Sequence, residues 1–179
     1  MKKRILFLIL IFAVVLLRTP LFGFLFSYKI ITEREPVAEI EDKELKAAAG
    51  KKAGVYNVED IIQDAQEITA SRLGFTFEKC GHEINALTVS QKANCIGYAA
   101  FLAAVIRYEL RQQNLEDQWQ VRHQVGNVYF LNTNMNRYIM SAFFRDHDFV
   151  TMENTQTGET VALDATVYDY LKINRIRLR

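Results

Sequence analysis

The residues of this chain best suited to covalent chemistry are a cysteine, a histidine and an aspartate that follow one another along the sequence. Cys95 begins a long apolar segment directly after Asn94, a residue type that commonly caps the start of a helix. A thiol in the first helical turn lies at the positive end of the helix dipole, which favours the nucleophilic thiolate. The amide N–H groups of the same turn lack partners inside the helix, so they could hold an oxyanion.

A nucleophilic thiolate needs an imidazole to move its proton and a third group to orient that imidazole. His147 opens one predicted strand, and Asp164 lies near the end of the next. The loop at residues 155–158 predicts an antiparallel hairpin, in which the start of one arm lies beside the end of the other. We therefore expect His147 and Asp164 to meet at one end of a sheet and to form a catalytic triad with Cys95.

Helical periodicity predicts the elements that position the cysteine. Apolar residues recur at helical spacing over residues 58–72, after the start signal at Asn57. Residues 95–113 form a second predicted helix, and every residue of 98–106 is apolar, so this helix should be buried on all sides. Residues 74–94 show no clear period and are predicted to be mostly loop.

The C-terminal half predicts strands. Alternation of apolar and polar residues predicts a strand within residues 119–131, followed by a turn at 132–136. Further strands are predicted near residues 138–144, 147–153 and 159–165. Helices followed by an antiparallel meander predict the α+β class.

The N-terminal residues predict a membrane anchor. Residues 1–4 are basic, residues 5–17 are uniformly apolar, and apolar residues resume at 21–26. No small-x-small cleavage site follows, so we interpret this segment as an uncleaved anchor that crosses the bilayer. A short, shallow hairpin, an interfacial helix and a cleaved secretion signal are the alternatives. The basic N-terminus predicts that the domain lies outside the cytoplasm.

The predicted organisation has three parts. Residues 1–28 are the anchor, residues 29–56 are a linker with one short helix near 42–49, and residues 57–179 are a single domain. The whole chain has a formal charge of +1. From Pro36 onward, however, the sequence has 16 Lys and Arg residues and 19 Asp and Glu residues, which gives this part a net charge of −3. A domain with a net negative charge argues against a nucleic-acid partner.

The run KANCIGYAAFLAAVIR at residues 92–107 resembles the nucleophile helix of the transglutaminase-like superfamily. That family has a cysteine at the helix start, then Tyr-Ala, an apolar run and an arginine. A histidine on one strand and an aspartate on the next follow, as in HDFV at residues 147–150 and LDAT at 163–166. The resemblance covers roughly residues 58–170. It implies a papain-like fold, with the buried nucleophile helix packed on an antiparallel sheet.

Other arrangements of these residue types are open at this stage. His123 is a competing base, although its position in the middle of a strand favours a surface or core role. Cys80 and His82 could form a zinc site with Cys95 and His123, but their spacing matches no common zinc pattern. Cys80 and Cys95 could also form a disulfide. Gln91 could donate to an oxyanion.

The resemblance implies cysteine-dependent acyl transfer on amide bonds of a protein or peptide, with Cys95, His147 and Asp164 in the site. The acyl group would pass to water, as in a peptidase or amidase, or to an amine, as in protein crosslinking. No cofactor or metal is expected. The alternatives are a membrane-tethered module of the same fold that binds a peptide or protein without chemistry, and a structural membrane protein with Cys80 bonded to Cys95.

Overall fold

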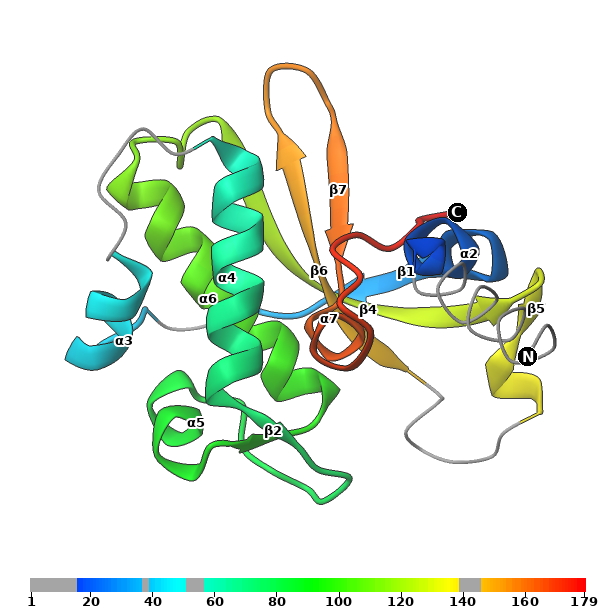
Figure 1. The fold of residues 1–179 in the computed structure, drawn as a ribbon, viewed down its shortest axis with the longest axis horizontal. Helices are drawn as coiled ribbons and strands as arrows, with labels where there is room; N and C mark the ends of the chain where they lie inside the picture. The colour runs from blue at the N-terminus through cyan, green and yellow to red at the C-terminus, as the bar shows by residue number, and fades with distance from the viewer. Residues whose placement is uncertain (1–15, 37–38, 51–56, 139–145) are drawn as a thin grey trace, which may run out of the picture.

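The computed structural model describes residues 16–36, 39–50, 57–138 and 146–179, and shows helices packed against an antiparallel sheet (Figure 1). The α+β class predicted from the sequence is confirmed. The main helices are α3 (Lys43–Ala49), α4 (Val58–Arg72), α5 (Ile84–Ser90), α6 (Cys95–Gln112) and α7 (Ala165–Leu171). The main sheet has the order β1 (Phe26–Glu33), β4 (Trp119–Phe130), β6 (His147–Asn154) and β7 (Thr160–Leu163).

The shorter elements lie beside these. Strand β5 (Thr133–Asn134) pairs with the end of β4, and a single turn of 3-10 helix follows at Met135–Arg137. Strands β2 (Gly74–Phe75) and β3 (Lys92–Ala93) form a small parallel pair next to the start of α6. The prediction that residues 74–94 are mostly loop was wrong for α5, because a seven-residue helix is too short to show a clear hydrophobic period.

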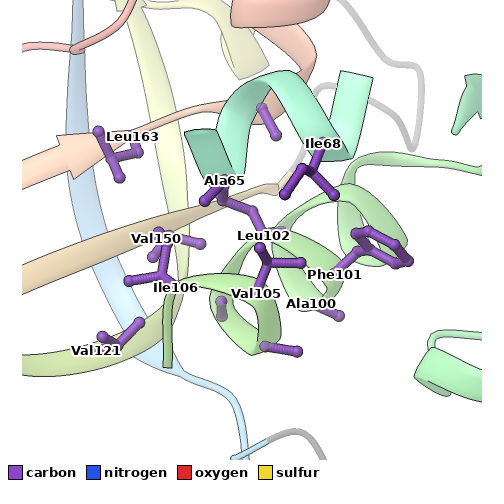
Figure 2. Close-up of a cluster of buried hydrophobic side chains, with 14 of the residues drawn as sticks. Ala65, Ile68, Ala100, Phe101, Leu102, Val105, Ile106, Val121, Val150 and Leu163 are labelled. Atoms are coloured by element: carbon purple, nitrogen blue, oxygen red, sulfur yellow. The ribbon is translucent and has the colours of Figure 1, made fainter. Parts of the chain in front are cut away.

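Helix α6 lies at the centre of the core, between α4 and the sheet (Figure 2). The predicted burial of this helix is confirmed, since each residue from Tyr98 to Ile106 is buried. Side chains from three layers meet there: Leu102, Val105 and Ile106 from α6, Ala65 and Ile68 from α4, and Val121, Val150 and Leu163 from the strands. The core therefore holds the central part of α6, whose first turn carries Cys95.

The N-terminal segment differs from its prediction. Helix α2 (Arg18–Leu25) has eight residues, and Phe26 begins β1, which pairs antiparallel with β4 along its whole length. Within the described residues, no helix has the length and apolar character needed to cross a membrane. The prediction of a transmembrane helix that runs to Phe26 was therefore wrong, because helix α2 ends at Leu25 and Phe26 begins a strand of the sheet. The orientation predicted from residues 1–4 lies outside the described residues.

Strand β1 also extends into the range predicted as a linker. Residues 29–33 continue the strand, and the short helix predicted near residues 42–49 is present as α3. The strand predicted near residues 138–144 lies, apart from Tyr138, outside the described residues.

The C-terminal residues connect the two edges of the main sheet. Ile176 pairs with Ala162 of β7, and Leu178 pairs with Tyr28 of β1. The backbone N–H of Tyr28 donates to Arg177 O at 2.8 Å, and the N–H of Arg179 donates to Tyr28 O at 3.0 Å. The C-terminal segment thus holds Tyr28 through both its backbone N–H and its backbone C=O.

Candidate functional site

His147 and Asp164 are brought together by the β6–β7 hairpin, as the sequence predicts. The register places Val150 of β6 opposite Leu163 of β7, so Asp164 follows directly after the pairing ends. His147 lies at the first position of β6. His147 Nε2 is 2.7 Å from Asp164 Oδ2, and both side chains are buried. This interaction leaves Nδ1 as the ring nitrogen that can face a thiol.

Asp164 is oriented by its second role as the cap of α7. Its Oδ1 accepts hydrogen bonds from the backbone N–H of Thr166 at 3.0 Å and of Val167 at 3.2 Å, and from Thr166 Oγ1 at 2.5 Å. These donors fix one carboxylate oxygen to the helix start. The other oxygen, Oδ2, is therefore directed at His147.

Cys95 completes the arrangement at the start of α6. His147 makes a side-chain hydrogen bond with Cys95, so the imidazole contacts both the thiol and the carboxylate. Asn94 caps the helix, and its Oδ1 accepts from the N–H groups of Ile96 and Gly97 at 3.1 and 3.3 Å. Two of the amides expected to be available for an oxyanion are thus occupied. The Cys95 N–H has no acceptor within the described residues and is the remaining candidate in this turn.

The electrostatics of the buried pair favour the charged forms. Burial by itself lowers the pKa of His147, but the adjacent Asp164 carboxylate and the contact with Cys95 raise the pKa of His147 from 6.5 to about 10. Burial raises the pKa of Asp164, but the His147 charge and the hydrogen bonds from His147, Thr166 and Val167 lower it below its ordinary value. An imidazolium next to a carboxylate is the state that stabilises a neighbouring thiolate.

Tyr28 is a member of the site that sequence reasoning missed. Its hydroxyl donates to Asp164 Oδ2 at 2.9 Å, and its ring lies 5.8 Å from the His147 ring, centroid to centroid. Burial, followed by the charge and hydrogen bond of Asp164, raises the pKa of Tyr28 well above its ordinary value, so the hydroxyl stays a donor. No local signal marks Tyr28, because its role depends on the pairing of β1 with β4.

His123, the competing base, lies in a different pair. Its Nε2 is 2.8 Å from Asp148 Oδ1, and Arg34 donates to both oxygens of the same carboxylate, with Nη2 to Oδ2 at 3.2 Å. Burial alone would raise the pKa of Asp148, but His123 and Arg34 lower it. His123 is therefore a satisfied core histidine.

The other arrangements considered from the sequence, namely a disulfide, a zinc site and an oxyanion donor at Gln91, are not formed around the triad. Both cysteines are free thiols, and Cys80 Sγ accepts a hydrogen bond from the Asn94 N–H at 3.2 Å. Within the part of the chain that the structure describes, no group of three or more His, Cys, Asp or Glu side chains could hold a metal ion. Gln91 is exposed and ends α5 in a left-handed conformation with φ of 53°.

A groove of about 580 Å³, here called the aromatic groove, lies against His147, Asp164 and Thr166. Its wall is almost entirely apolar. It includes Phe22, Phe26, Phe75, Phe77, Val128 and Leu171, which come from α2, β1, the β2 region, β4 and α7. The groove thus brings together segments from both ends of the chain beside the histidine.

Comparisons with known proteins give no relative for this chain. No family model matches the sequence, no curated protein is significantly similar to it, and no solved structure matches its fold.

Proposed function

We propose that the protein is a cysteine-dependent acyl-transfer enzyme of the transglutaminase-like type, with a papain-like arrangement of its core, that acts on amide bonds. The observation that carries the proposal is that His147 contacts Cys95 and Asp164 at once, while α6 and the β6–β7 hairpin hold the three residues from separate elements. This is the order of groups that an activated thiolate requires.

The proposed reaction begins with the thiolate of Cys95 and the imidazolium of His147. The sulfur adds to the amide carbonyl carbon, and the Cys95 N–H stabilises the oxyanion that forms. His147 then gives its proton to the leaving amine, the C–N bond breaks, and a thioester remains on Cys95. Asp164 holds the imidazolium through Oδ2, while Thr166 and α7 keep the carboxylate in place.

Transfer of the acyl group from the thioester completes the cycle. Water or an amine adds to the thioester carbonyl after giving a proton to His147, and the C–S bond breaks to restore the thiolate. Water yields a carboxylic acid, as in an amidase or peptidase, whereas an amine yields a new amide, as in crosslinking. The hydrogen bond between His147 and Cys95 supports a role for His147 in proton transfer with either acceptor.

The rate of thiol alkylation tests this proposal. We expect iodoacetamide at pH 6.5 to modify Cys95 at least tenfold faster than Cys80, as measured by mass spectrometry of peptides at timed intervals. His147→Gln should abolish this preference, and Asp164→Asn should reduce it. His82→Gln is the matched control, because His82 is exposed and lies outside the triad.

Equal and slow modification of the two cysteines in the folded protein would contradict the proposal. That result would favour the alternative of a module that binds a peptide or protein without chemistry. A loss of Cys95 reactivity in His82→Gln, with His147→Gln unaffected, would also contradict the assignment of His147 as the base.

A further inference from the structure

The polar groups in the wall of the aromatic groove already bond to one another. Asp164 accepts from Thr166, Tyr28 and His147, and His147 also contacts Cys95. A polar ligand group inside the groove would therefore lose its hydrogen bonds to water and gain few in return, which is unfavourable. The groove wall therefore favours a ligand portion made of hydrocarbon.

The size and the lining of the groove further restrict the class of ligand that it can bind. Its volume of about 580 Å³ lies within the ordinary range of ligand pockets, and its wall combines aromatic and aliphatic side chains. A peptide segment of this size would carry several backbone amides, each of which needs a partner. A hydrocarbon chain needs none.

We propose that the aromatic groove binds a long acyl chain, so that the substrate class is an N-acyl amide in which a fatty acyl group is joined to an amine or a peptide. This inference rests on the proposed function, because it names the acyl group that Cys95 accepts. In this assignment the chain occupies the groove, whose wall includes His147, and the amide carbonyl lies next to that residue. The wall does not include Cys95, so the carbonyl reaches the sulfur past His147, which is hydrogen-bonded to Cys95.

The reaction is balanced with the groups already described. The sulfur of Cys95 forms a bond to the acyl carbon, the C–N bond breaks, and the amine leaves with the proton of His147. The intermediate is a fatty thioester on Cys95 with its chain still in the groove. Water then releases the fatty acid and restores the thiolate and the protonated imidazole.

Binding measured without catalysis tests the groove by itself. In the Cys95→Ala protein, we expect isothermal titration with N-acylglycinamides of 4 to 12 carbons to show affinity that increases about fourfold per added methylene. Affinity that is independent of chain length would overturn the inference. Tighter binding to phosphatidylglycerol vesicles than to the 12-carbon amide would indicate a membrane surface as the ligand and would also overturn it.

Two substitutions separate the groove from the rest of the surface. Val128→Trp fills the groove, and we expect it to weaken binding of the 12-carbon amide at least tenfold. Val89→Trp is the matched control on α5, where the side chain is 86% exposed, and should bind like the parent protein. If Val128→Trp does not fold, Leu171→Arg at the half-exposed edge of α7 replaces it, and unchanged binding in the folded variant would overturn the inference.

Catalysis is measured separately on the unaltered chain. Incubation with the 12-carbon amide should give an adduct on Cys95 with the mass of the acyl group, trapped at low pH and identified by mass spectrometry. Chain-dependent binding to Cys95→Ala without any adduct or turnover in the unaltered chain would refute the proposed function and this substrate assignment together. An adduct from short amides, with no dependence on chain length, would refute the assignment alone.

Discussion

Tyr28 and His147 share one oxygen atom of Asp164. The Tyr28 hydroxyl lies 2.9 Å from Oδ2, and His147 Nε2 lies 2.7 Å from the same atom. The carboxylate is thus held by a strand from the N-terminal part of the chain and by a hairpin from the C-terminal part. The site depends on β1, which begins inside the segment that the sequence alone assigns to a membrane anchor.

Removal of the Tyr28 hydroxyl should destabilise the protein. Tyr28→Phe keeps the buried ring but takes one donor from a buried carboxylate, and a hydrogen bond to a charged group contributes about 1.5–3 kcal/mol. We expect the free energy of unfolding to decrease by that amount in urea titrations followed by circular dichroism. Tyr138→Phe is the control, because that side chain is 74% exposed. Equal stability of Tyr28→Phe and the parent protein would show that the hydroxyl is dispensable.

The pH dependence of stability should reveal the His147–Asp164 pair. The pKa of His147 is raised to about 10 in the folded protein, against about 6.5 when unfolded, so its contribution is complete below pH 6.5 and is lost as the pH rises toward 10. In that interval the folded state holds one more proton, and stability should fall by up to about 1.4 kcal/mol per pH unit relative to His147→Gln. The pKa of Asp164 is lowered, so its contribution is lost only in acid.

Urea midpoints of the parent protein and His147→Gln, measured from pH 5 to pH 10, check this expectation. The difference between the two proteins should be largest near pH 5–6.5 and smallest near pH 10. A difference that stays constant across the range would mean that His147 binds no additional proton on folding.

Close packing at the start of α6 should make Gly97 intolerant of a side chain. A Cβ at Gly97 would lie 2.8 Å from Ala93 Cβ and 3.2 Å from Leu87 Cδ2, so α6 must shift. We expect Gly97→Ala to cost about 1–3 kcal/mol in thermal or urea unfolding and to slow alkylation of Cys95. Gly81→Ala should be neutral, since a Cβ there has no neighbour within 4 Å. Full stability of Gly97→Ala would argue against the contact between α6 and β3.

A charge in the centre of α6 should prevent folding. Leu102 is fully buried, and an unpaired carboxylate there would cost several kcal/mol, close to the total stability of a typical domain. We expect Leu102→Asp to yield no cooperative transition, whereas Glu116→Ala, at an exposed position after the helix, melts like the parent protein. A soluble Leu102→Asp protein with a cooperative transition would contradict the central position of α6.

Local sequence patterns predicted α4 and α6 because each carries enough residues to display a period or an unbroken apolar run. The β6–β7 hairpin was equally predictable, since a turn at residues 155–158 separates two short strands, and this turn brings His147 to Asp164. These elements contain Cys95 and His147, and Asp164 follows directly after β7.

The supporting residues could not be predicted in the same way. Aromatic residues such as Phe26 and Tyr28 occur both at the end of a membrane span and at the start of a buried strand. Hydropathy therefore does not distinguish these two structures. The pairing of Arg34 with Asp148 joins residues 114 positions apart and depends on β1 lying beside β4. Contacts of this kind follow from the fold and leave no short-range pattern.

The separation of 136 positions between Tyr28 and Asp164 also sets an order of events during synthesis. At about 5–20 residues per second, a ribosome needs roughly 7–27 s to travel from one to the other. Cys95 is made well before His147, so the thiol leaves the ribosome without its imidazole. The nascent chain therefore carries Cys95 without the groups that activate it. The triad can form only after β6 and β7 have been translated and β1 has paired with β4.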